Sequence, residues 1–87
     1  MTKEEWFVYI VCCQKDNSFY TGITNNLYKR IEAHNKNKGA KYTRGRGPIK
    51  LIKSFGPMTK SEALSLEFKI KQLSREDKLK LIDISNL

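Results

Sequence analysis

Glu67 is the residue whose type fits its surroundings least. Plotted at the helical period of ~100° per residue, six neighbouring apolar side chains fall on one wide arc: Ala63, Leu64, Leu66, Phe68, Ile70 and Leu73. Glu67 lies near the middle of that arc, so a helix would aim its carboxylate at the core. Because an unpartnered buried carboxylate costs several kcal/mol, it must be protonated, paired with a cation or bound to a metal. A salt bridge to an arginine at the core edge and a metal-binding or catalytic role are both open at this point.

Arg30 and His34 form a second group with chemical potential. They are i,i+4 neighbours that flank the apolar stripe of Leu27 and Ile31, so a helix places them on one face. A lone histidine beside such a stripe usually packs and forms a hydrogen bond. An arginine next to it at the core edge is better suited to recognising phosphate than to packing.

Two tyrosines, Tyr9 and Tyr20, lie on consecutive strand-like segments. A loop at Asp16 and Asn17 would place both side chains on the same face of a hairpin. Strand tyrosines usually supply apolar area with a hydroxyl that reaches solvent or a backbone group, so these two are ordinary when taken alone.

The segments that must position these side chains begin with the hairpin itself. Residues 6–13 are continuously apolar and rich in aromatic and β-branched residues, which predicts a central strand covered on both faces. A polar connection leads to a second strand at 19–24. Asn25 or Asn26 can cap a helix that runs to about Asn37.

The second half of the chain predicts one strand and two helices. Residues 49–55 form the strand, which Gly56 and Pro57 end. A capping box at residues 59 and 62 starts a helix that ends near residue 73, and Ser74 caps a last short helix. The order β-β-α-β-α-α predicts an α+β fold, an α/β sandwich in which a three-stranded antiparallel sheet is flanked by helices.

Positive charge is concentrated in the middle of the chain. In total, 17 Lys and Arg oppose 9 Asp and Glu for a net charge of +8, and residues 29–53 hold nine basic side chains but one acid. Residues 36–48 show no hydrophobic period, which predicts a long loop that is functional or mobile. Such a field favours a polyanion through counterion release, and solubility alone is the simpler alternative. The expected nucleic-acid contacts are Lys36, Lys38, Lys41, Tyr42, Arg44 and Arg46.

Size, hydropathy and cysteine usage restrict the setting. Eighty-seven residues suffice for one domain, 1–87, with its core at about 6–82. No apolar run approaches the ~20 residues that cross a bilayer, and a secretory signal is absent, so no membrane contact is expected. Cys12 and Cys13 are adjacent, so in a strand they point to opposite faces and are expected to be buried thiols in a reducing cytoplasm.

Taken in order, these residues resemble the GIY-YIG nuclease superfamily. The matching pattern is Phe7-Val8-Tyr9, ten intervening residues, Tyr20-Thr21-Gly22, Arg30 eight positions after that glycine, His34 four later, and Glu67 on a subsequent helix. Residues 39–45 and 61–64 further resemble the small stand-alone bacterial branch of the superfamily. Phe7 and Thr21 replace the glycine and isoleucine of the name-giving motifs, and both flank the reacting groups.

The resemblance implies a role for each matched position. Tyr9 and Tyr20 are the tyrosines of the two motifs, and Gly22 allows a close backbone approach beside them. Arg30 is the catalytic arginine. Glu67 is the sole protein ligand of a divalent metal, Mg²⁺ or Mn²⁺.

The expected activity is hydrolysis of phosphodiester bonds in nucleic acid, in DNA rather than RNA, with a role in DNA repair or processing. Tyr9 would orient or deprotonate the attacking water, but its reference pKa of about 10 leaves little phenolate at neutral pH. His34, which matches a histidine of several branches, is the alternative base. A protein partner would supply specificity, since no target-selecting domain is recognisable. Two other interpretations stay open: a non-catalytic nucleic-acid-binding module in which Glu67 only pairs with Arg30, and an adaptor for an acidic protein.

Overall fold

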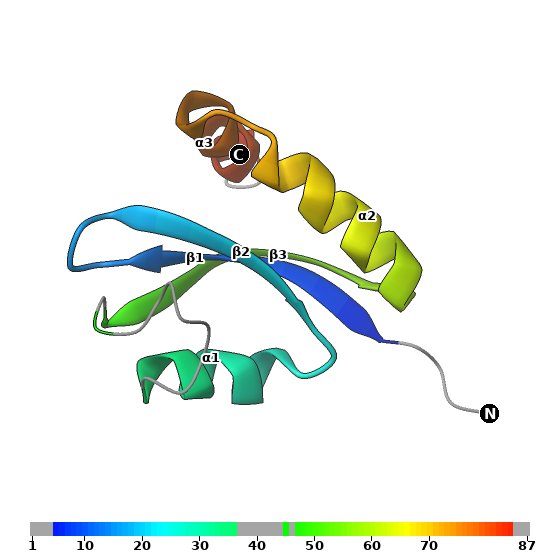
Figure 1. The fold of residues 1–87 in the computed structure, drawn as a ribbon, viewed down its shortest axis with the longest axis horizontal. Helices are drawn as coiled ribbons and strands as arrows, with labels where there is room; N and C mark the ends of the chain where they lie inside the picture. The colour runs from blue at the N-terminus through cyan, green and yellow to red at the C-terminus, as the bar shows by residue number, and fades with distance from the viewer. Residues whose placement is uncertain (1–4, 37–44, 46, 85–87) are drawn as a thin grey trace.

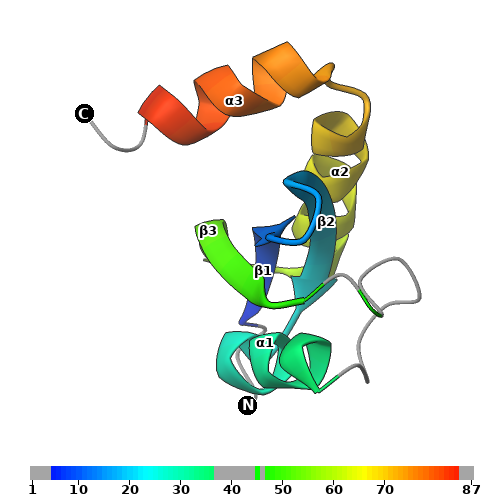
Figure 2. The same ribbon diagram turned by 90° about the vertical axis from the view of Figure 1, so that its left-hand side faces the viewer.

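A computed structural model describes residues 5–36, 45 and 47–84 of the chain. The elements in order are β1 (Trp6–Cys13), β2 (Ser18–Thr24), α1 (Leu27–Asn35), β3 (Ile49–Met58), α2 (Lys60–Lys71) and α3 (Arg75–Ile84). The strands form one antiparallel sheet in the order β2-β1-β3. Helix α1 covers one face of this sheet, and α2 and α3 lie over the other (Figure 1 and Figure 2). The predicted α+β fold and its element order are confirmed.

Strand β1 is buried on both faces because its successive side chains enter two different cores. One core lies between the sheet and the helices α2 and α3, and its buried members are Val8, Ile10, Ala63, Ile70 and Ile82. The other lies between the sheet and α1, and its buried members are Tyr9, Val11, Cys13 and Ile49. The unbroken apolar run of β1 is therefore required by the layers on either side of it, as predicted.

The β1–β2 hairpin sets the two tyrosines on one face. In its antiparallel register, Tyr9 lies directly opposite Gly22. Tyr20 packs against the same core as Tyr9, so the predicted common face is confirmed. Asn17 in the connection adopts a φ of 59°, a left-handed conformation that asparagine adopts more readily than most residues.

Side-chain caps start all three helices. The Asn26 side chain accepts a hydrogen bond from a backbone N–H in the first turn of α1. Thr59 and Glu62 form a complete capping box at the start of α2. Ser74 accepts a backbone N–H in the first turn of α3. Because these oxygens satisfy N–H groups that have no partner within the helix, the predicted helix starts are confirmed.

Strand β3 continues past the point where it was expected to stop. The prediction that Gly56 and Pro57 end this strand is wrong, because Met58 still pairs with Trp6 of β1. Gly56 adopts a φ of 137° where the register shifts between Trp6 and Val8. A glycine supplies this conformation, and a proline is tolerated because β3 is an edge strand.

The apolar stripe of α2 is narrower than its sequence suggests. Ala63 and Ile70 are buried, and Leu66 packs beside them against the sheet. Leu64 and Phe68, which were predicted to join the core-facing arc, are 47% and 65% exposed. The helix lies on the sheet along one line only, so side chains on either flank of that line reach solvent.

The two cysteines point to opposite faces of β1, and neither is in a disulfide. Cys13 is buried, whereas Cys12 is partly exposed near the end of the strand, so the expectation of two buried thiols is wrong for Cys12. Within the described ranges, no helix is both long and apolar enough to cross a membrane.

Candidate active site

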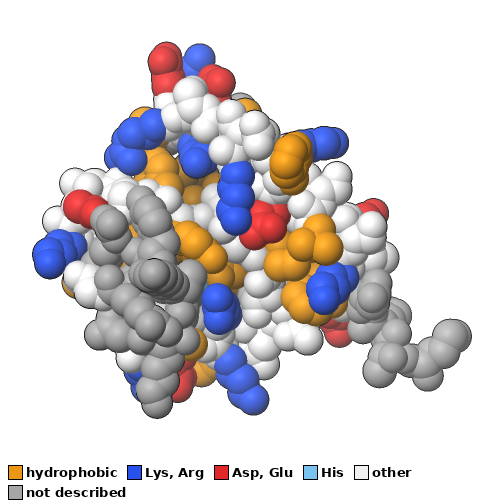
Figure 3. All heavy atoms as spheres, in the orientation of Figure 1, with side chains coloured by type: hydrophobic (Ala, Val, Ile, Leu, Met, Phe, Trp, Pro, Cys, Tyr) orange, Lys and Arg blue, Asp and Glu red, His pale blue; other side chains and the backbone are white. Residues whose placement is uncertain are grey.

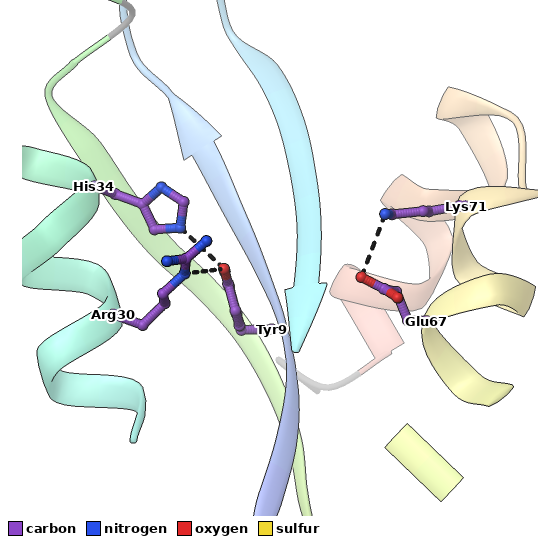
Figure 4. Close-up of polar contacts among 5 residues, drawn as sticks. All are labelled: Tyr9, Arg30, His34, Glu67 and Lys71. Atoms are coloured by element: carbon purple, nitrogen blue, oxygen red, sulfur yellow. Dashed lines mark hydrogen bonds and ion pairs between the residues drawn. The ribbon is translucent and has the colours of Figure 1, made fainter. Parts of the chain in front are cut away.

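Four side chains predicted to act in catalysis meet between the sheet and α1, namely Tyr9, Tyr20, Arg30 and His34. The Tyr9 Oη atom lies 2.9 Å from His34 Nε2 and accepts a hydrogen bond of 3.2 Å from Arg30 Nε (Figure 4). The Tyr20 ring meets the His34 ring edge-on at a centroid distance of 5.5 Å. Its centroid lies 6.3 Å from that of Tyr9. Both strands of the hairpin and α1 therefore contribute to one cluster.

Helix α1 delivers Arg30 and His34 together because they are one turn apart. Leu27 and Ile31 pack against the core beneath the helix, which fixes this face against the sheet. His34 is fully buried and Arg30 is partly exposed at the border of the core. The predicted shared face of these two residues is confirmed.

Gly22 lets the Tyr9 ring lie against β2. A Cβ atom at this position would be 2.6 Å from Tyr9 Oη and 3.1 Å from a ring carbon of Tyr20. Side-chain carbons do not approach a buried oxygen so closely, so any residue larger than glycine would displace Tyr9. The glycine after the second tyrosine thus serves the position of the first.

The hydrogen bonds of the cluster assign its proton positions. Burial, and then the charge of Arg30, lower the pKa of His34 from 6.5 to about 4, so its imidazole is neutral at neutral pH. Arg30 Nε is a donor, so the Tyr9 hydroxyl donates its own proton to His34 Nε2. The proton of the neutral imidazole then resides on Nδ1.

Tyr9 stays protonated in this environment. Burial is the largest influence and raises its pKa, while the hydrogen bond and charge of Arg30 act in the opposite direction. Smaller upward contributions come from Tyr20 and from the negative charge of Glu67. Hydrogen bonding to Tyr9 in turn raises the pKa of Arg30, and Tyr20 adds a smaller upward contribution, so the guanidinium is a permanent cation bonded to the Tyr9 hydroxyl.

Glu67 lies on the other side of strand β2. Figure 4 shows its carboxylate pointing from α2 toward β2, while Tyr9, Arg30 and His34 lie beyond the strand. The side chain is 19% exposed, and its Oε2 atom lies 3.3 Å from Nζ of Lys71. Because its charge raises the pKa of Tyr9, the carboxylate acts electrostatically on the cluster around the sheet edge. The structure therefore gathers four of the predicted residues directly and sets the fifth across β2 from them.

Lys71 is a member of the site that the sequence analysis missed. Its Nζ atom contacts Glu67 and lies 5.9 Å from the centroid of the Tyr20 ring. The spacing of four residues on one helix was visible in the sequence. The two alternatives predicted for Glu67, a salt bridge to an arginine and a metal-binding or catalytic role, did not include this lysine.

The donor set at Glu67 fits a hard divalent cation. Among the described residues, no three His, Cys, Asp or Glu side chains gather into a cage that could hold a metal. Mg²⁺ is commonly held by one or two carboxylates, its own waters and a substrate phosphate, and a single carboxylate across β2 from an arginine is compatible with that arrangement. A structural zinc site, which needs several nitrogen or sulfur ligands, does not fit.

Basic side chains surround this edge of the molecule. Figure 3 shows Lys and Arg side chains spread over the face that has β2 toward the viewer, with an acidic side chain near its middle. Lys36 is exposed at the end of α1, where its Nζ lies 2.9 Å from Glu32. The other expected nucleic-acid contacts lie outside the described residues: Lys38, Lys41, Tyr42, Arg44 and Arg46.

The fold and the site together define a GIY-YIG type of domain. Its three-stranded sheet places an arginine from a helix against two tyrosines of a hairpin, and a later helix carries a glutamate. The family model described as "GIY-YIG catalytic domain" matches residues 5–80. The chain belongs to this family, and the resemblance drawn from its motifs is confirmed.

Close relatives are small bacterial proteins named UPF0213. One from Oceanobacillus iheyensis is 52% identical over 80 residues, covering 92% of each protein. One from Clostridium perfringens is 56% identical over 81 residues, covering 93% of this chain and 86% of the relative. The solution NMR structure of the UPF0213 protein BH0048 from Bacillus halodurans superposes with a TM-score of 0.59 at 44% identity, covering 92% of this chain and 84% of that one. The chain is therefore similar to the small stand-alone branch over nearly its whole length.

Proposed function

We propose that this chain is a divalent-metal-dependent endonuclease that hydrolyses phosphodiester bonds in nucleic acid, in DNA rather than RNA. The observation that carries the proposal is the placement of a guanidinium, Arg30, and a carboxylate, Glu67, on the two sides of β2. Membership of the GIY-YIG family supports the nuclease class. A role in DNA repair or processing is part of the same proposal.

Arg30 is the group that receives the scissile phosphate. The Tyr9 hydroxyl accepts a hydrogen bond from Arg30 Nε and holds the guanidinium, so it needs little reorganisation when a phosphate arrives. A fixed donor of this kind stabilises the charge that develops on the phosphate oxygens, and removing one typically slows a reaction by about 10²- to 10³-fold.

The two tyrosines differ in burial, so we assign them different roles. Tyr9 and His34 have no exposed surface, which conflicts with the expectation that Tyr9 contacts the attacking water directly. Tyr20 is partly exposed beside Arg30. In the proposal, Tyr20 orients the water, while Tyr9 positions Arg30 and connects it to His34.

His34 is the proton acceptor within the cluster. The charge of Arg30 is one of the two causes that lower its pKa. A bound phosphate offsets that charge, so the pKa of His34 rises when substrate binds, and His34 accepts the hydroxyl proton of Tyr9 more readily, with the oxygen left on Tyr9 beside Arg30 Nε.

Glu67 would hold the cation at the sheet edge, across β2 from Arg30. A divalent ion bound there would supply Lewis-acid neutralisation of charge on the phosphate and on the departing oxygen. The part-buried setting of Glu67 keeps its carboxylate directed at β2, where the phosphate would lie between carboxylate and guanidinium.

The basic residues that surround the site bind the nucleic-acid backbone without reading bases. Lys36 and the expected loop residues at 38–46 are suited to phosphate contacts, which predicts strong salt dependence and little sequence preference. A partner protein that supplies target selection remains part of the proposal.

The test is incubation of the purified protein with labelled linear, flapped, branched and single-stranded DNA and RNA, in Mg²⁺, Mn²⁺ or chelator. Cleavage is expected with metal and is slowed by about 10²- to 10³-fold in Glu67→Gln, while the matched variant Glu76→Gln, altered at a carboxylate that is 83% exposed, keeps its rate. Cleavage that survives chelator, or an unchanged rate in Glu67→Gln, defeats the metal assignment. Binding of every substrate without cleavage identifies a non-catalytic module.

The non-catalytic interpretation required Glu67 to serve only as the partner of Arg30. Arg30 instead bonds to the Tyr9 hydroxyl, and Glu67 pairs with Lys71. The guanidinium and the carboxylate each keep a separate neighbour, an arrangement suited to admitting a phosphate between them.

A further inference from the structure

Lys71 contacts both halves of the candidate site. Its Nζ atom lies 3.3 Å from Glu67 Oε2 and 5.9 Å from the centroid of the Tyr20 ring. Figure 4 shows the Lys71 side chain extending from α2 toward β2, next to the carboxylate of Glu67. The ammonium group thus lies beside the carboxylate and beside the tyrosine proposed to face the water.

This ion pair differs from two others of the same spacing. The pairs Glu32–Lys36 and Glu76–Lys80 are also i,i+4, but their carboxylates are 49% and 83% exposed. The Glu67 side chain is only 19% exposed. Water stabilises the first two carboxylates largely by itself, whereas a carboxylate withdrawn from water depends more on its counter-ion.

We propose that Lys71 is the resident counter-ion of Glu67 and competes with the divalent cation for that carboxylate. The inference rests on the proposed function, in which Glu67 is the metal ligand. In the metal-free protein the ammonium satisfies Glu67 and keeps its carboxylate directed at β2. A cation that binds Glu67 must displace the ammonium, which remains close because it is tethered one helical turn away and lies over Tyr20.

Competition of this kind links the metal to the substrate. A nucleic-acid phosphate at the Tyr20 side of β2 offers Lys71 a second anionic partner and releases Glu67. Nucleic acid therefore strengthens metal binding, and by linkage the metal strengthens nucleic-acid binding by the same factor.

The experiment measures Mn²⁺ binding without nucleic acid, through the paramagnetic broadening of backbone amide NMR signals near Glu67. In Lys71→Met, the Mn²⁺ concentration that half-broadens these signals is expected to fall roughly two- to fivefold, the size of effect that loss of a weak competing ion pair gives. Lys80→Met is the matched control, because it removes the same charge from another Glu–Lys pair on α3. It is expected to bind Mn²⁺ as the unmodified protein does.

Each outcome separates the inference from the proposed function. An unchanged concentration in Lys71→Met, or an equal fall in Lys80→Met, overturns the role of Lys71 and leaves Glu67 as the ligand. Broadening that persists in Glu67→Gln, or is absent near Glu67 in every variant, overturns the metal assignment and the inference together. Circular dichroism of each variant establishes that its fold is intact.

Discussion

The Gly22→Ala substitution tests the geometry of the cluster because its effect can be worked out from distances. An ordinary contact requires at least 3.4 Å, and the new Cβ would lie 2.6 Å from Tyr9 Oη, so the hydroxyl must retreat by about 0.8 Å. That movement lengthens hydrogen bonds now at 2.9 and 3.2 Å, and Tyr9 has no exposed surface through which to escape. Overpacking of this kind costs ~1–3 kcal/mol, and weakened hydrogen bonds add about 1 kcal/mol.

The assay is urea unfolding followed by circular dichroism. Alanine restricts the unfolded chain and returns ~0.4–1 kcal/mol, so a net loss of about 2 kcal/mol is expected. Gly47→Ala is the control, since its Cβ would meet nothing closer than 4.0 Å, and it should lose no stability and gain at most ~1 kcal/mol from the restricted unfolded chain.

A double variant identifies Tyr9 as the group that is displaced. Tyr9→Phe removes the nearest contact but leaves the ring carbon Cζ at 2.8 Å, so it should relieve part of the Gly22→Ala penalty, with a coupling of about 1 kcal/mol. Strictly additive effects, or a Gly22→Ala protein as stable as the parent, would refute the reasoning.

Three further predictions concern buried and exposed polar groups. Thr21 buries a hydroxyl that has no hydrogen-bond partner among the described residues, so Thr21→Val should raise the free energy of unfolding by about 1 kcal/mol; a loss in urea unfolding contradicts this. The folded-state pKa of His34, about 4, lies below its unfolded value of 6.5, so between these pH values the unfolded chain binds more protons than the folded protein. The free energy of unfolding therefore falls as the pH drops through this window, by up to ~3 kcal/mol. His34→Gln should flatten that slope, and equal slopes in the two proteins would show that His34 is not its source. Tyr20→Phe should slow cleavage by about 10²-fold at nearly unchanged stability, because the residue is partly exposed, and a large fall in stability would assign it a structural role instead.

Much of the fold was predictable because local signals agree with it. The apolar run of β1, the hairpin and the caps at Asn26, Thr59 and Ser74 each follow from residue type and spacing. The end of β3 was not predictable, because only pairing with β1 shows that a glycine and a proline can continue an edge strand. The exposed flank of α2 was missed for a related reason, since helical periodicity does not reveal how far a sheet extends beneath a helix.

Residue types and their ordered spacing identified the main members of the site. Which of them are buried, and on which side of β2 each one lies, could be learned only from the structure. The sequence placed Tyr9 and Tyr20 on one face. It did not show that Tyr9 is fully buried whereas Tyr20 is partly exposed. Helical periodicity predicted that the Glu67 carboxylate points inward, but only the packing of α2 on the sheet sets it on the opposite side of β2 from Arg30. The counter-ion Lys71 was within reach of the i,i+4 rule.

The central claim is that Arg30 and Glu67 act on one phosphate from the two sides of β2. Single-turnover cleavage rates of Arg30→Lys, Glu67→Gln and the double variant test it most directly. Each single change is expected to slow cleavage by about 10²- to 10³-fold. The double variant is expected to be slowed by far less than the product of the two single effects, and so to be only a little slower than the worse single variant. Two independent, fully multiplicative losses would contradict a shared site.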